Sequence, residues 1–203
     1  RTALQTRLRQ RKVNPVTNTP IDSDWINHHY PNGLHIDYKK LTFISTDLTD
    51  TNINHAVERW LYGDTSTYGL ITEWDTSNIT DMSELFSNAR FFNDDISNWN
   101  VSKVTNMEDM FHSAAAFNQP IGNWDVSNVT SMYFMFAYTK AFNQPIGDWN
   151  VSNVINMRSM FNGAKAFNQP IGNWNVSNVT NMWGMLESTE AFNQPIGNWN
   201  VSK

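Results

Sequence analysis

The side chains with most potential for chemistry lie near the amino terminus, where carboxylates and imidazoles occur close together. Such groups are common metal ligands, and this stretch holds Asp22, Asp24, His28, His29, His35 and Asp37. A solvated, loop-rich segment has the same composition, and we favour that interpretation. His55 stands apart from the group. We interpret His112 as a surface residue, because the equivalent positions in sister units hold Ala137 and Asn162.

No catalytic motif accompanies these side chains. The sequence contains no cysteine, which excludes disulfides, thiolate metal sites and cysteine nucleophiles. It also lacks the nucleophile-elbow, zincin, P-loop and EF-hand patterns. We therefore predict a protein that is not an enzyme and that uses no cofactor and no metal.

Charge is distributed unevenly along the chain. The net charge is -5, yet residues 1–12 have no acidic side chain and carry five basic ones, Arg1, Arg7, Arg9, Arg11 and Lys12. Such a basic arm suits an acidic protein surface, a lipid or a nucleic acid, and a solvated terminus is the alternative. No apolar run approaches the ~20 residues that a membrane-spanning helix needs.

The elements that must position any functional residue come from an internal repeat of 25 residues. Tryptophan recurs at this interval from Trp74 to Trp199, and the blocks F-N-Q-P-I-G-N-W and V-S-N-V-T-N-M recur with few changes. In one unit, Ile121, Trp124 and Val126 have the spacing of a leucine-rich strand. The apolar stripe that follows is typical of a short helix and comprises Val129, Met132, Met135 and Phe136.

These periods predict an α/β solenoid, a leucine-rich-repeat-like stack of short parallel strands on one side and short helices on the other. Units must stack because a single unit cannot offset the entropy lost when it becomes ordered. We divide the chain into a basic, turn-rich N-terminal arm (1–40), an N-terminal cap (41–73) with a helix over 51–62, and the repeat solenoid (74–203). The repeat stops in mid-pattern, so we expect truncation at the C-terminus. The open last strand would then allow end-to-end or assembly contacts.

The repeat also resembles a known family. Residues 68–82, YGLITEWDTSNITDM, resemble the opening of the BspA-like leucine-rich repeat surface proteins. The units with the pattern F-N-Q-P-I-G-x-W-x-V-S-x-V-x-x-M-x-x-M-F are similar to the repeat of that family, and the resemblance covers about residues 50–203. It implies an α/β solenoid without catalytic residues, a role in surface display, adhesion or protein binding, and a location at the cell surface or outside the cell.

Two sets of residues are candidate binding surfaces. Large aromatic side chains replace the polar residues of sister units on the predicted helix face, at Tyr133, Phe134, Tyr138 and Trp183. Exposed aromatics on a rigid frame are frequent interface anchors, and contact with an adjacent helix is the alternative. The second set is a row on the predicted strand face that points away from the core, formed by Asp75, Asn100, Asp125, Asn150, Asn175 and Asn200. An asparagine ladder that bonds to itself between units is the alternative for that row.

We therefore expect a non-enzymatic protein-binding or adhesion module of a surface-displayed repeat protein. Other proteins are the expected partners, with a glycan as a second class of ligand. The alternative is a structural or scaffold subunit of a larger multi-protein assembly, such as a particle shell or membrane complex. It would be held by its N-terminal arm and solenoid faces, and would belong to an intracellular or viral assembly.

Overall fold

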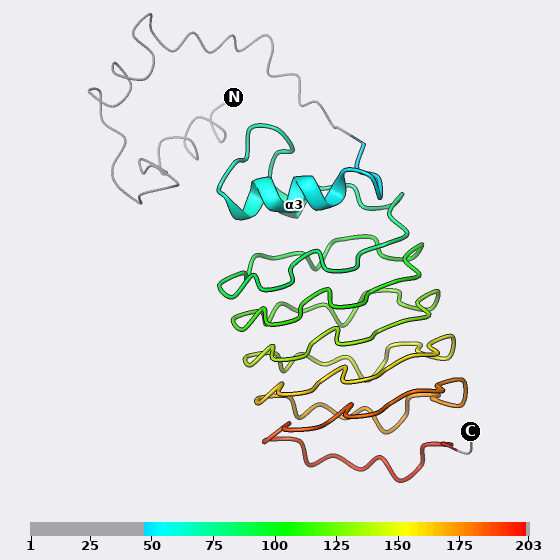
Figure 1. Ribbon diagram of the computed structural model, residues 1–203. Coiled ribbons are helices and arrows are strands. Elements are labelled where there is room, and N and C mark those ends of the chain that lie inside the picture. The colour runs from blue at the N-terminus through cyan, green and yellow to red at the C-terminus, as the bar shows by residue number, and fades with distance from the viewer. Residues whose placement is uncertain (1–46, 202–203) are drawn as a thin grey trace, which may run out of the picture.

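The computed structural model describes residues 47–201 and shows successive stretches of chain lying one below another beneath a terminal helix (Figure 1). Within this range there is one α-helix, α3 (Ile53–Leu61), one short 3₁₀ helix, η1 (Ile71–Glu73), and no β-strand. No helix of this range is both long and apolar enough to cross a membrane. Extended pairing is limited to isolated parallel bridges that join, in series, Asp81, Asn106, Ser131, Asn156 and Asn181.

The predicted α/β solenoid is therefore wrong for residues 47–201. The parallel strands on one side and the repeated helices on the other are both missing, so the leucine-rich-repeat description of the fold does not hold. Tight turns take their place. The Trp124 amide donates to the Ile121 carbonyl across the predicted strand, and the Met135 amide donates to the Met132 carbonyl across the predicted helix. Bonds between residues three apart close turns, so neither segment can extend into a regular element.

The predicted helices of the repeat do not form, because two residues in each unit have a positive φ. In one unit these are Phe134 and Tyr138, with φ of 52° and 57°. A left-handed residue cannot continue a right-handed helix, so apolar residues at three- and four-residue steps lie in consecutive turns instead. The equivalent positions of the other units share this conformation, at Glu84, Asn88, Asp109, Ser113, Ser159, Gly163, Gly184 and Ser188.

Alternate backbone amides of these turns bond to the next unit, and most of the amides between them bond within their own unit. In residues 132–138, every second backbone amide donates to a carbonyl 24 positions later, as Met132 does to Asn156 and Phe134 does to Arg158. The equivalent segments that begin at Met82, Met107 and Met157 do the same. The same row begins at Met82 and is last seen at Gly163. All of its amides point toward the later unit, so the stack has a defined direction.

Like side chains of successive units meet in the core. Two phenylalanine columns run through the stack, with ring centroids of neighbouring units 5.5–6.1 Å apart. Within one unit the two columns touch, as Phe111 and Phe117 do at 3.9 Å. The tryptophans connect units as well, because the Nε1 of Trp99 donates to the Ile71 carbonyl and later tryptophans repeat this bond. The 25-residue interval in the sequence is thus the vertical repeat of the core.

Helix α3 covers the first end of the stack (Figure 1) and lies within the range predicted to be helical. Its residues Ile53, Ala56 and Val57 are buried. Its Trp60 packs edge-on against Trp74, with ring centroids 6.3 Å apart. Arg59 of α3 donates a hydrogen bond to Asp64 in the following loop, and this contact helps to hold the helix over the core.

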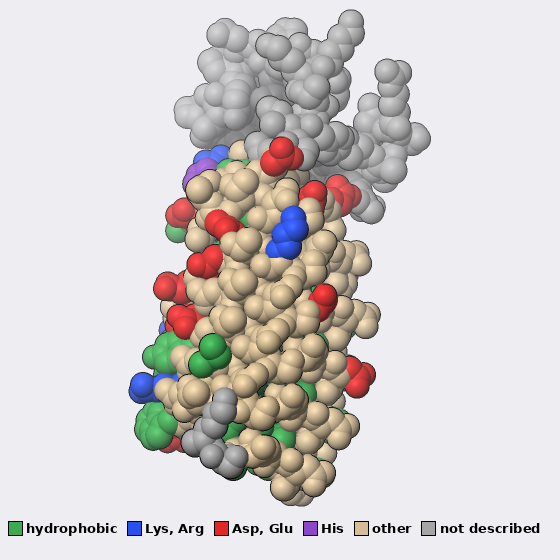
Figure 2. All heavy atoms as spheres, turned by 90° about the vertical axis from the view of Figure 1, so that its right-hand side faces the viewer, with side chains coloured by type: hydrophobic (Ala, Val, Ile, Leu, Met, Phe, Trp, Pro, Cys, Tyr) green, Lys and Arg blue, Asp and Glu red, His purple; other side chains and the backbone are tan. Residues whose placement is uncertain are grey.

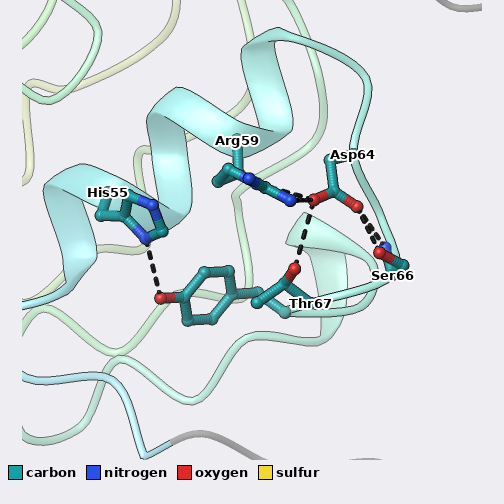
Figure 3. Close-up of polar contacts among 6 residues, drawn as sticks. His55, Arg59, Asp64, Ser66 and Thr67 are labelled. Carbon is teal, nitrogen blue, oxygen red and sulfur yellow. Dashed lines mark hydrogen bonds and ion pairs between the residues drawn. The ribbon is translucent and has the colours of Figure 1, made fainter.

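Two carboxylates fix this cap. Asp64, in the loop after α3, accepts hydrogen bonds from Arg59, Ser66 and Thr67 (Figure 3). Asp50, before α3, accepts from the Thr80 amide at 2.8 Å and from the Asp81 amide at 3.2 Å. In later units the amide equivalent to that of Thr80 bonds to a carbonyl of the preceding unit. Asp50 therefore supplies the acceptor that an earlier unit would provide.

Several predictions concern residues 1–46 and 202–203, which lie outside the described range. These are the basic arm, the first part of the predicted cap and the six candidate metal ligands between Asp22 and Asp37. Within residues 47–201, no three His, Asp or Glu side chains are placed to hold a metal ion.

Candidate interaction surface

Arg158 lies between two aromatic rings from neighbouring units. Its guanidinium carbon is 4.9 Å from the ring centroid of Trp183 and 5.9 Å from that of Tyr133. The three residues meet because they occupy the same position in successive units. The Arg158 Nε is buried and has no hydrogen-bond partner among the described residues. Cation–π contacts with the two rings therefore hold the guanidinium, and they fix the rings in return.

The other predicted aromatics extend this surface. The ring centroids of Tyr133 and Phe134 are 4.5 Å apart, and Phe134 lies perpendicular to the ring of His112 at 5.8 Å. His112 in turn lies 5.9 Å from Tyr138. Trp183 is 65% exposed and Tyr138 is 46% exposed, whereas the other two aromatics are half-buried. We call this surface the aromatic patch and define it as Tyr133, Phe134, Tyr138, Arg158 and Trp183.

Acidic groups border the aromatic patch on the side of the earlier units. Burial raises the pKa of Asp109, His112 lowers it, and the carboxylates of Glu84 and Glu108 raise it again, with a net increase. The nearest oxygen of Asp109 is 3.7 Å from the Nδ1 of His112. The patch thus has a guanidinium between two of its rings and carboxylates on the side of the earlier units. Figure 2 shows a mostly uncharged face, with hydrophobic side chains gathered beside basic ones at its lower left edge.

Among protein families, the model that matches is described as "Mycoplasma protein of unknown function, DUF285", and it matches residues 51–165 and 122–203. Together the two matches extend over more than half of the chain. The chain belongs to the DUF285 family. Neither the curated proteins nor the solved structures give a match. The resemblance to the BspA-like proteins thus stays a prediction, and the DUF285 description assigns no activity.

The second predicted row has a different role in this DUF285 chain. All of its residues are exposed, but they do not lie on a strand, since none is present in the described range. No hydrogen bond joins Asp75, Asn100, Asp125, Asn150 or Asn175 to another of these five between units. The Asn100 Oδ1 accepts from the Ser102 amide two residues later, and Asp75, Asp125, Asn150 and Asn175 make the same bond. The row therefore closes local turns. Its carboxylates and side-chain amides lie exposed at these turns.

Hydrogen bonds with the serine two residues later also affect the acids of this row. The hydroxyl and then the amide of Ser77 lower the pKa of Asp75, and Ser127 does the same for Asp125. Both carboxylates therefore stay charged to lower pH than ordinary aspartates. A groove of about 590 Å³ is lined by asparagine and threonine side chains and one isoleucine, namely Asn128, Thr130, Asn153, Ile155, Asn178 and Thr180.

Sequence reasoning missed Arg158, which belongs to the aromatic patch, and dismissed His112, which contacts it. The available signal for Arg158 was its register, since it is 25 residues from both Tyr133 and Trp183. The signal for His112 was weaker, because its contacts with Phe134 and Tyr138 depend on the left-handed turns that bring these rings together.

Proposed function

We propose that this chain is a non-enzymatic protein-binding or adhesion module that uses the aromatic patch as its main contact surface. The observation that supports this most strongly is the position of Arg158 between Tyr133 and Trp183. Aromatic residues and arginine are the residue types most enriched at the energetic centres of protein interfaces. Holding their side chains in contact reduces the entropy lost when a partner binds. Display on a surface rests on the resemblance to the BspA-like proteins alone.

A triple variant tests the proposal. Tyr133→Ser, Phe134→Ser and Trp183→Ser together remove the rings but leave the phenylalanine core in place. Immobilised wild-type chain and variant are each incubated with an extract of native material, and the bound proteins are identified by mass spectrometry. We expect the wild type to retain a partner that the triple variant loses.

A matched control is available elsewhere on the surface. Tyr62 is 73% exposed and Phe91 is 94% exposed, and neither belongs to the aromatic patch. The double variant Tyr62→Ser, Phe91→Ser should retain the partner. Circular dichroism checks that all variants are folded. Retention of the partner by a folded triple variant would rule out the aromatic patch as the binding surface.

The second candidate function is a structural or scaffold subunit. Native purification distinguishes the two functions. A scaffold subunit remains in a particle of fixed stoichiometry, whereas an adhesion module is recovered alone or with a dissociable partner.

A further inference from the structure

The guanidinium of Arg158 has no hydrogen-bond acceptor within residues 47–201. Its Nε is buried without a partner, and no other N–H group of this side chain bonds to a described residue. Arg59, by contrast, donates to Asp64, and Arg90 is exposed to solvent. Buried polar groups are almost always paired, so an unpaired one requires an explanation. Arg158 is half-buried and carries donors that the described part of the chain does not use.

The position of this guanidinium is fixed before any partner binds. The Arg158 amide donates to the Asn156 Oδ1 at 3.1 Å, and the Trp183 amide makes the same bond to Asn181. The rings of Tyr133 and Trp183 cover the guanidinium from the preceding and the following unit. An acceptor must therefore approach along the side that the rings leave open. The planar fork of N–H groups presented there matches the two oxygens of a carboxylate.

The charges around Arg158 favour a carboxylate over a phosphate. Motifs that carry phosphate are usually bound by clusters of arginines, and Arg158 is the one cation of the aromatic patch. The carboxylates of Glu84, Glu108 and Asp109 lie close together beside the patch. They repel a phosphate dianion more strongly than a carboxylate with a single charge. The expected ligand group is therefore a single carboxylate.

The arrangement of opposite charges favours a protein segment over an acidic sugar. Glu108, Tyr133 and Arg158 occupy the same position in three successive units, so a ring separates the carboxylate from the guanidinium. Two units correspond to roughly 10 Å at the usual spacing of neighbouring extended segments. Residues three apart in an extended peptide are separated by about the same distance, ~10 Å. A peptide can thus place an acid over Arg158 and a base near Glu108, whereas an acidic sugar supplies only the negative charge.

We propose that Arg158 binds a carboxylate side chain of the protein partner, and that the same partner segment carries a basic side chain, about three residues away, that faces Glu108 and Asp109. The rings between these groups provide apolar contact area. The two charge pairs determine which segment binds and in which orientation. This inference rests on the proposed function, because it names the chemistry of the partner at the same aromatic patch.

An NMR titration of the isotope-labelled chain tests the inference. The probes are acetyl-Lys-Leu-Phe-Glu-amide and acetyl-Glu-Phe-Leu-Lys-amide, which present the two charges in both chain directions, at a pH where glutamate is ionised. We expect at least one of them to shift the signals of the Arg158 Nε–H and the Trp183 indole N–H in a saturable manner. Glutamine in place of the peptide's glutamate should weaken binding by at least about tenfold, because a charge-assisted hydrogen bond is lost.

Variants of the chain separate the charge of Arg158 from its shape. Arg158→Lys keeps a cation near the rings but loses the planar fork, so it should bind the peptide about tenfold more weakly, measured at the Trp183 signal. Arg90→Lys is the matched control, because Arg90 is exposed and lies outside the aromatic patch, and it should bind like the wild type. In the double variant Glu108→Gln, Asp109→Asn, replacing the peptide's lysine by glutamine should no longer weaken binding. Circular dichroism checks that each variant is folded.

The outcomes that overturn the inference are distinct. They are equal binding of the glutamate and glutamine peptides, no saturable shift with either chain direction, and binding by Arg158→Lys equal to that of the wild type. Tighter binding of glucuronic acid than of the peptides also overturns it, because the occupant is then an acidic sugar. The pull-down separates these failures from failure of the proposed function. A partner that the triple variant loses but Arg158→Gln retains overturns the carboxylate inference alone, whereas a partner that both retain overturns the proposed function as well.

Discussion

The ring of Tyr138 lies directly against the backbone of Gly163, one unit later in the stack. A Cβ on Gly163 would be 2.6 Å from the Tyr138 Cδ1 and 3.0 Å from its Cε1. Gly163 also has a φ of 68°, which glycine adopts without the steric penalty of a side chain. The position of an aromatic patch residue thus depends on a missing side chain in the neighbouring unit.

Gly163→Ala is expected to lower the free energy of unfolding by about 3 kcal/mol, measured by urea denaturation. About 1–2 kcal/mol comes from the left-handed backbone and the remainder from overlap with Tyr138. Gly69→Ala is the matched control, because Gly69 has a φ of 72° but no atom near its Cβ position. It should lose only the backbone contribution. Equal losses in the two variants would show that the Tyr138 ring moves aside at no cost.

The asparagine of the F-N-Q-P block should contribute to stability only where a later unit is present. The Asn143 Oδ1 accepts from the Asn168 amide and from the Gln169 Nε2, both at 2.9 Å. Asn143→Ala leaves these donors unpaired and should cost about 1–3 kcal/mol in urea denaturation. Asn143→Asp keeps the acceptor oxygen and should recover part of the loss. Asn193, the equivalent residue of the last unit, accepts no such bonds in the described range. If Asn193→Ala proved as costly, the ladder would not be the cause.

Asp50 should make the stability of the cap depend on pH. Burial raises the pKa of Asp50, but hydrogen bonds from the Thr80 hydroxyl and from the Thr80 and Asp81 amides more than offset this, so the folded-state pKa lies below the ordinary 3.8. A lowered pKa stabilises the fold above about pH 4, and this contribution disappears as the pH falls through the folded-state value.

Asp50→Asn is therefore expected to be less stable at neutral pH, by about 1 kcal/mol. It should also lose less stability than the wild type on acidification. Urea denaturation between about pH 6 and pH 2.5 measures both effects. Asp47→Asn is the control, because it changes a nearby exposed carboxylate that does not bond to Thr80. Parallel pH profiles for Asp50→Asn and the wild type would contradict the assignment.

The sequence predicted the interval of the stack but not the conformation of the chain within it. Recurrence of Phe111, Phe136 and Phe161 at one spacing indicates that like rings meet, and in the structure they do. The apolar steps around Met132 and Met135 equally fit a helix and a series of three-residue turns. Only the residues with positive φ decide between a helix and a series of turns. Most of them are not glycine, so the residue types did not indicate a left-handed conformation.

The candidate surface was predictable to a similar extent. Substitution of aromatic for polar residues at repeat positions pointed to Tyr133 and Trp183. Their contact through Arg158 follows from the register, once units are known to lie directly above one another. The approach of Tyr138 to His112 does not follow from the register, because it depends on the turn at Tyr138. Local backbone geometry, rather than spacing, set the limit of the prediction.

Adjacent phenylalanines provide the sharpest test of the register. Phe92 belongs to a phenylalanine column and is 5% exposed, whereas its neighbour Phe91 is 94% exposed. Phe92→Ala removes a ring that is stacked on both Phe86 and Phe117 and should cost about 3–5 kcal/mol in urea denaturation. Phe91→Ala should change stability by no more than about 0.5 kcal/mol, as exposed substitutions usually do. A large loss for Phe91→Ala, or a small one for Phe92→Ala, would mean that the columns at the 25-residue interval do not form the core of the first unit.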